Sequence, residues 1–155
     1  MIPEVFVQRV CGATDAVINE LQEELYQNAE GLAESYWTES LRRRAGPNQE
    51  RPAFALKLER QKAGVGIYWR RVSFVRVNGD KKWALRTTHV PLGTTKDRYL
   101  PGKFRAAPAW EREMINQLEE QFEVIRKISR YLGRTAQMAR SGVGWRARNA
   151  PEART

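Results

Sequence analysis

The spacing at which apolar residues recur changes twice along this chain, and this change most limits what it can fold into. From residue 14 to 44 the apolar residues recur every three or four positions, as on one face of a helix. From Phe54 they alternate with polar residues, as in a strand with one buried face. The helical period returns at Pro108 and lasts to Gly133. We therefore predict an α+β fold in which two long amphipathic helices flank a sheet.

The middle of the chain predicts three strands. The first begins at Phe54, and the second covers residues 67–77, which are rich in β-branched and aromatic side chains. Asn78-Gly79 favours a tight hairpin turn, and a third strand follows over about 81–90. The expected order is α-β-β-β-α, with the strands in an antiparallel meander.

Capping residues set the expected ends of both helices. Thr14 or Asp15 can cap the first helix, which Gly46 should end, with Gly31 as a candidate bend. The second helix should end at Gly133. The residues beyond it are mainly Arg, Ala, Gly and Ser, which can bury little. We therefore expect one domain over residues 1–133 and a flexible basic tail over 134–155.

Positive charge is segregated along the chain. Residues 1–40 hold eight acids against Arg9 alone, whereas residues 41–105 hold 17 lysines and arginines against four acids. The net charge of +9 therefore comes from the middle of the chain and from the five arginines after residue 133. Segregated charge of this kind creates a local field that attracts polyanions. Nucleic acid is the partner that this distribution favours.

Side chains suited to catalysis are few. His89 is the only histidine and Cys11 the only cysteine, so one chain offers neither a two-histidine metal site nor a zinc site made of thiolates. The three aspartates fall on a helix start, a turn and a loop, without the spacing of paired metal ligands. Gly64-Val65-Gly66 lacks the lysine and hydroxyl residue that end a phosphate-binding loop. We expect no enzymatic activity, no metal site and no cofactor.

Aromatic and cationic residues crowd the hairpin formed by the second and third strands. Alternation places Arg70 and Arg76 on one face and Arg71 on the other, so neither face is cleanly apolar. Cationic side chains can follow phosphates, aromatic rings can stack on bases, and a two-stranded ribbon fits a major groove. We therefore predict a nucleic-acid-binding surface. Its candidate residues in the hairpin are Tyr68, Trp69, Arg70, Arg71, Arg76, Lys81, Lys82 and Arg86.

The long segment between the third strand and the second helix adds further candidates. Loops of this length in a compact domain are usually functional or disordered. The candidate residues there are Lys96, Arg98, Tyr99, Lys103 and Arg105.

Purely structural interpretations of the same residues remain open beside the prediction of nucleic-acid binding. Trp69, Phe74 and Trp83 can fill a core while the arginines form a solvated rim. The long segment can be a simple connection anchored by Leu100 and Phe104. The acidic first helix can neutralise the basic sheet within the molecule, and its long apolar stripe can exceed what one sheet covers and so support a dimer.

The chain resembles the MobI-type mobilisation proteins of integrative and conjugative elements and related plasmids. The features that carry the resemblance are the chain size, the strand sequence Ile-Tyr-Trp-Arg-Arg at residues 67–71, the later segment with Tyr99 and Phe104, and the helix that follows. They cover roughly residues 14–133. The resemblance implies an auxiliary factor that acts at the origin of transfer beside a separate relaxase.

We therefore expect a DNA-binding accessory factor of conjugative transfer in the cytoplasm. A relaxase or another transfer protein, and a second copy of the chain, are further candidate partners. No membrane partner is expected, because no apolar stretch approaches the ~18 residues that span a bilayer. Two alternatives stay open: an adaptor whose acidic helix and basic sheet bind different proteins, and a small transcriptional regulator.

Overall fold

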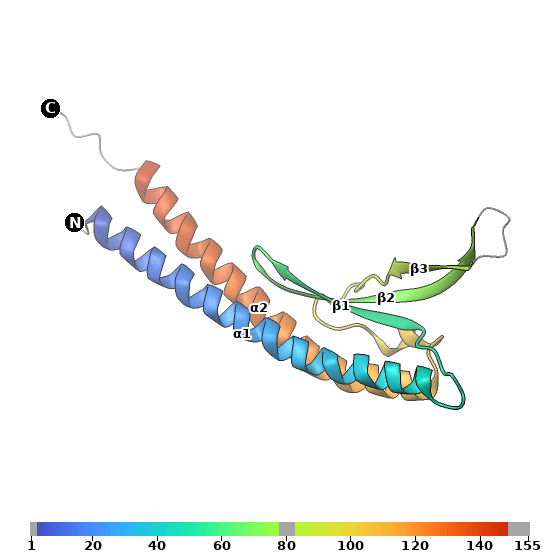
Figure 1. The fold of residues 1–155 in the computed structure, drawn as a ribbon. Helices are drawn as coiled ribbons and strands as arrows, with labels where there is room; N and C mark the ends of the chain where they lie inside the picture. The colour runs from blue at the N-terminus through green and yellow to red at the C-terminus, as the bar shows by residue number, and fades with distance from the viewer. Residues whose placement is uncertain (1–2, 78–82, 149–155) are drawn as a thin grey trace.

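The computed structural model describes residues 3–77 and 83–148. Its elements are α1 (Glu4–Ala45), β1 (Phe54–Gln61), β2 (Gly64–Arg76), β3 (Trp83–His89), the short 3-10 helix η1 (Pro101–Phe104) and α2 (Ala109–Arg148). The three strands form one antiparallel sheet in the order β1-β2-β3. The predicted α+β architecture, two helices flanking a three-stranded antiparallel meander, is confirmed (Figure 1). The expected turn at Asn78-Gly79 lies outside the described residues.

Both helices are longer than the capping residues predict. Helix α1 begins ten residues before Thr14, at Glu4, and passes Gly31 without a break before ending at Gly46 as expected. Helix α2 passes Gly133 and continues to Arg148, so the helix end expected at Gly133 is wrong. The two additions lie against each other, and the Cys11 thiol is 3.7 Å from the Ala139 carbonyl oxygen. Each addition therefore gains from a tertiary contact that a single segment cannot reveal.

Gly133 has a packing role in place of the capping role expected for it. A Cβ atom on this residue would lie 2.7 Å from the carbonyl oxygen of Ala63, in the turn between β1 and β2. The glycine therefore lets that turn approach α2 closely.

Both helices pack against the same face of the sheet. The strand residues on this face include Phe54, Leu56, Ile67 and Trp69, all of which are buried. The hydroxyl oxygen of Tyr36 in α1 lies 2.7 Å from the Phe54 carbonyl oxygen. The hydrophobic core therefore lies between the sheet and the two helices.

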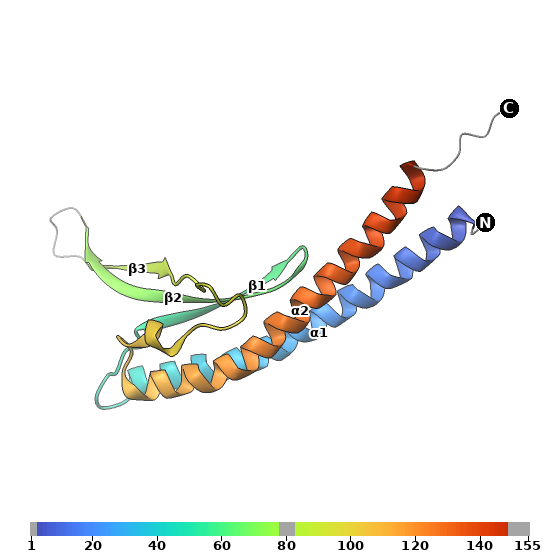
Figure 2. The ribbon, with the colours of Figure 1, turned by 180° about the vertical axis from the view of Figure 1, so that it is seen from behind.

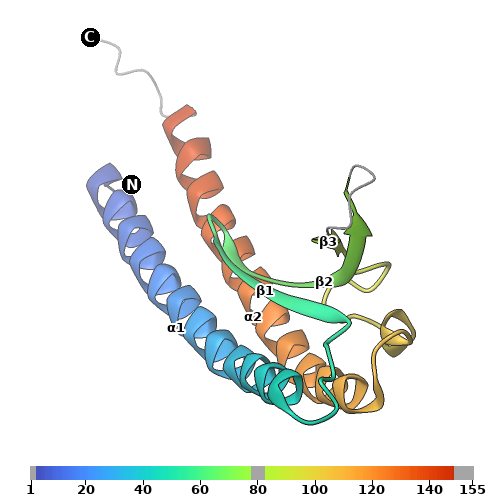
Figure 3. The same ribbon diagram turned by 45° about the vertical axis from the view of Figure 1, so that its right-hand side comes forward.

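The sheet covers only part of the helices, and two parts of the molecule project beyond this region (Figures 1 and 2). We call residues 70–76 of β2 with residues 83–89 of β3 the ribbon, because these residues pair with each other and β1 pairs with β2 only up to Arg71. We call residues 4–21 of α1 with residues 134–148 of α2 the arm. It continues past the β1–β2 turn as two neighbouring helices whose ends diverge (Figure 3).

Candidate nucleic-acid interface

The ribbon is an exposed, two-stranded antiparallel element that bears cations. Its register pairs Ser73 with Arg86 and Phe74 with Leu85. Phe74 keeps 45% and Leu85 62% of their surface exposed, so this cross-strand pair is not part of the core. β2 and β3 together contain four arginines and no Asp or Glu. The ribbon therefore has the electrostatic character of a polyanion-binding element.

The arginines divide between the two faces, as alternation predicts. Arg71, opposite Thr88, and Arg86, opposite Ser73, share the face on which Trp69 lies. Arg70, opposite His89, and Arg76 share the other face. Arg71 and Arg86 are exposed, and neither pairs with a carboxylate among the residues that the structure describes.

The face of the ribbon that carries Arg70 has a cross-strand hydrogen bond and a cation–π contact. One guanidinium nitrogen of Arg70 donates a 3.3 Å hydrogen bond to the Thr87 carbonyl oxygen across the strands. The guanidinium carbon of Arg51 lies 5.2 Å from the centre of the Phe74 ring, which is cation–π geometry. Sequence patterns missed Arg51, because it precedes β1 and reaches Phe74 only through strand pairing. This face therefore offers an exposed ring with cations on both sides of it.

Two aromatic candidates belong to the core. Trp69 has no exposed surface and Tyr99 has 1%, so neither ring can stack on a base in this structure. Trp69 packs edge-on against Tyr36 and Phe104, with ring centres 5.0 and 5.7 Å away. The core interpretation of Trp69 is correct. Tyr68 is half-buried and lies edge-on to His89, with 5.7 Å between the ring centres.

The segment after β3 is an anchored connection that does not extend the ribbon. Tyr99 and Phe104 hold it to the core, whereas Leu100, an anchor in the alternative interpretation of this segment, is 49% exposed. Arg98 lies 3.5 Å from a Glu123 carboxylate oxygen, and Lys103 donates to the carbonyl oxygen of Pro91. Lys96 and Arg105 are exposed, and Lys81 and Lys82 lie outside the described residues. The structure therefore groups Arg70, Arg71, Arg76 and Arg86 on the paired strands, and Lys96 lines a pocket with Tyr68 and His89 at their edge.

A buried polar network holds the base of β2, and sequence patterns missed it. Glu119 is 1% exposed and accepts a 2.7 Å hydrogen bond from the Trp69 indole and one of 2.9 Å from the Tyr99 amide. Arg126 forms a 2.9 Å ion pair with the same carboxylate and also donates to the Ile67 carbonyl oxygen. The available signal is that Glu119 and Arg126, seven residues apart, share the helix face of Phe122. These contacts hold the buried part of β2 against α2, just before the strand continues into the exposed ribbon.

A second buried carboxylate holds the start of β1. Glu111 has no exposed surface and accepts hydrogen bonds from the amides of Ala53 and Phe54, at 2.7 and 2.9 Å. The Tyr36 hydroxyl lies 2.6 Å from the same carboxylate. Burial raises the pKa of Glu111, and these hydrogen bonds oppose that rise. Both networks are structural, because neither carboxylate is open to a ligand.

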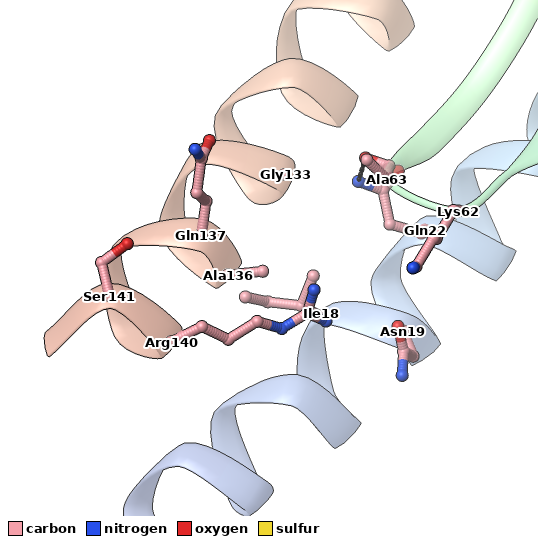
Figure 4. Close-up of a pocket in the computed structure, with 10 residues that line it drawn as sticks. All are labelled: Ile18, Asn19, Gln22, Lys62, Ala63, Gly133, Ala136, Gln137, Arg140 and Ser141. Atoms are coloured by element: carbon pink, nitrogen blue, oxygen red, sulfur yellow. Dashed lines mark hydrogen bonds between the residues drawn. The ribbon is translucent and has the colours of Figure 1, made fainter. Parts of the chain in front are cut away.

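The pocket beside the β1–β2 turn offers little catalytic chemistry. A pocket of about 460 Å³ lies where the β1–β2 turn meets the helices, and Lys62, Gln22, Gln137 and Arg140 supply much of its polar lining (Figure 4). Its lining residues include no carboxylate, histidine or thiol. Across residues 3–77 and 83–148, no group of three or more His, Cys, Asp or Glu side chains is placed to hold a metal ion. Within the same residues, no helix has the length and apolar character needed to cross a membrane.

Comparison with known proteins identifies one family. No curated protein and no solved structure gives a significant match to the chain. The model of the family described as "MobI protein" matches residues 25–140. The match covers the whole sheet, half of α1, most of α2, and every candidate residue named above. The chain therefore belongs to the MobI family of mobilisation proteins.

Proposed function

We propose that this protein is a DNA-binding accessory factor of conjugative transfer that acts at the origin of transfer beside a separate relaxase. Family membership supports a role in mobilisation. The single observation that carries DNA binding is the ribbon: an exposed pair of strands with arginines on both faces, no acids, and a position away from the helices (Figure 1).

The dimensions of the ribbon favour duplex DNA. The major groove is about 12 Å wide and admits a two-stranded β-ribbon. Because side chains are exposed on both faces of the ribbon, it can contact the phosphates on both sides of the groove. Trp69 and Tyr99, the candidates for stacking on single strands, are buried. In this arrangement Arg71 and Arg86 contact one wall of the groove, and Arg70 and Arg76 contact the other.

A binding titration on single variants tests this proposal. Affinity for duplex DNA from the cognate transfer origin should fall steeply with salt, because each neutralised phosphate releases condensed counterions. Arg71→Ala and Arg86→Ala should each weaken binding, and each should reduce the slope of log affinity against log salt by about one unit if it contacts one phosphate. Fluorescence anisotropy at several salt concentrations measures both quantities.

Arg60→Ala is the matched control. Arg60 lies at the far end of the sheet, where its guanidinium forms a 2.9 Å ion pair with Glu23. Its removal changes the net charge by the same amount and should leave the salt slope unchanged. If the ribbon variants stay folded and bind with wild-type affinity and slope, the ribbon is not the DNA-binding surface and the adaptor function replaces this proposal.

Strand cleavage belongs to the relaxase in this proposal. The chain has one histidine and one cysteine, and they are far apart in sequence. We expect the purified protein with Mg²⁺ to leave supercoiled origin DNA intact. Nicking that copurifies with the protein and disappears on mutation of one of its acidic residues would contradict this division of labour.

A further inference from the structure

The helices carry a second apolar surface, on the side away from the sheet. On α1, Phe6, Val10, Val17 and Leu21 are 39–55% exposed. On α2, Val124, Ile128, Tyr131 and Met138 are 42–74% exposed. No element among the described residues covers this side of the helices (Figure 3). We call these eight residues the outer stripe.

The spacing of the outer stripe is that of a helix-packing seam. The α2 residues follow one another at steps of four, three and seven, which is a heptad pattern. Residues 6, 10, 17 and 21 of α1 are separated by four, seven and four. The seam inside the chain uses other positions, such as Ile18 and Ala136, which are buried. Each helix therefore has one apolar seam that is buried within the chain and one that is exposed.

The charged residues beside the outer stripe favour a second copy of this chain as the partner. Over residues 4–39, α1 has eight acids and one cation, Arg9. After Glu123, α2 has only cations among its charged residues. Several of these charges pair within the chain, but Glu20 and Glu24 beside the α1 residues of the stripe are exposed, as are Lys127 and Arg134 beside the α2 residues. An acidic helix surface thus lies beside a basic one. A copy turned by a two-fold axis places its basic helix on the acidic one and its acidic helix on the basic one, which makes the surface complementary to itself.

The size of the surface is that of a weak, reversible contact between two copies. Two helices, each about 10 Å across, over the ~24 Å of helix spanned by the 16 residues from Phe6 to Leu21 give a face of roughly 480 Å². A standard interface buries about 800 Å² on each partner.

We propose that two copies of the chain associate through the outer stripe into an antiparallel four-helix bundle, with α1 of each copy beside α2 of the other. The bundle buries the exposed seam of both helices. It leaves both ribbons outside the interface, so the dimer does not depend on the proposed DNA binding.

Sedimentation equilibrium of the full-length protein over a range of concentrations tests the dimer. We expect a monomer–dimer equilibrium in the wild type. Val17→Glu and Met138→Glu should each shift the dissociation constant at least tenfold towards monomer, with unchanged helical circular dichroism. Leu85→Glu is the control: it places the same charge on an exposed apolar site of the ribbon and should leave the equilibrium unchanged. A wild type that is monomeric throughout, or a dimer indifferent to both stripe variants, overturns the proposal.

Charge reversal tests the pairing of unlike helices. Glu20→Lys with Glu24→Lys makes one variant, and Lys127→Glu with Arg134→Glu makes the other. Each variant alone should dimerise more weakly, because both of its contacts then join like charges. A mixture of the two should form a heterodimer, in which both contacts again join opposite charges. Absence of the heterodimer would contradict the α1-to-α2 pairing.

Discussion

The region where the sheet covers the helices and the two parts that project from it are made of the same elements in different surroundings. In β2, Val65, Ile67 and Trp69 are at most 8% exposed, whereas Phe74, further along the same strand, is 45% exposed. In the helices, Ala29 and Ile115 are fully buried, whereas Val10 and Met138 of the arm are about half exposed or more. One strand and two helices thus run from a core into solvent without interruption.

The comparison shows that stability and recognition are separated along single elements. Buried polar networks at Glu111 and Glu119 fix the covered region, where each carboxylate accepts hydrogen bonds from another element. The ribbon has exposed arginines instead, which are available for other molecules. We therefore expect mutations in the covered region to change stability, and mutations in the projecting parts to change binding.

The largest expected effect separates two aromatic residues of β2. Trp69→Ala should lower the free energy of unfolding by about 3–5 kcal/mol, because it empties a core site and removes a donor from Glu119. Phe74→Ala should change it by no more than about 1 kcal/mol, because the ring is half exposed and contacts one guanidinium. Urea unfolding of both variants measures the difference. Equal losses would show that the ribbon is part of the core.

The next effect separates two glycines in the helices. Gly133→Ala should destabilise the protein by about 1–3 kcal/mol, because its new methyl group would meet the Ala63 carbonyl oxygen at 2.7 Å. Gly31→Ala should stabilise it by up to about 1 kcal/mol, because nothing lies within 4 Å of the added carbon and alanine favours a helix. Thermal melting compares the two variants. A stabilising Gly133→Ala would mean that the β1–β2 turn does not rest on α2.

A smaller effect concerns pH. Burial raises the pKa of Glu111 above 4.5, so the folded protein keeps this proton to a higher pH than the unfolded chain does. The contribution of this group to stability is therefore greatest below pH 4.5 and falls as the pH rises through the folded pKa.

Glu111→Gln removes this titration. The free energy of unfolding of the wild type, measured relative to that of the variant by urea unfolding at several pH values, should decrease from pH 4.5 upwards. A difference that is flat or that rises with pH would show that the hydrogen bonds from Tyr36, Ala53 and Phe54 outweigh burial.

The smallest expected effect on stability is at the ribbon. Arg86→Ala should change the free energy of unfolding by no more than about 0.5 kcal/mol, because Arg86 is exposed and has no carboxylate partner among the described residues. Chemical unfolding of the same preparation used for DNA titration measures this. A loss comparable to that of Gly133→Ala would mean that the ribbon is held by contacts of Arg86, and the division between stability and binding would fail.

The sequence by itself determined the order and type of the elements. The change from helical to alternating spacing, the end of α1 at Gly46 and the basic, acid-free character of β2 and β3 all follow from neighbouring residues. Strand alternation also places Arg71 and Arg70 on opposite faces. These properties are local, because backbone geometry relates residues one to four positions apart.

Only the tertiary structure decided which of those residues are buried and how far the helices extend. Alternation puts Tyr68 and Trp69 on opposite faces, yet which face is covered depends on helices distant in sequence. Glu111 and Glu119 look like surface acids until other segments supply their hydrogen-bond donors. The helices exceed their expected ends for a similar reason: their outer parts contact each other across more than 120 residues of sequence, as Cys11 and Ala139 do. Burial is a property of neighbours in space, which local spacing cannot specify.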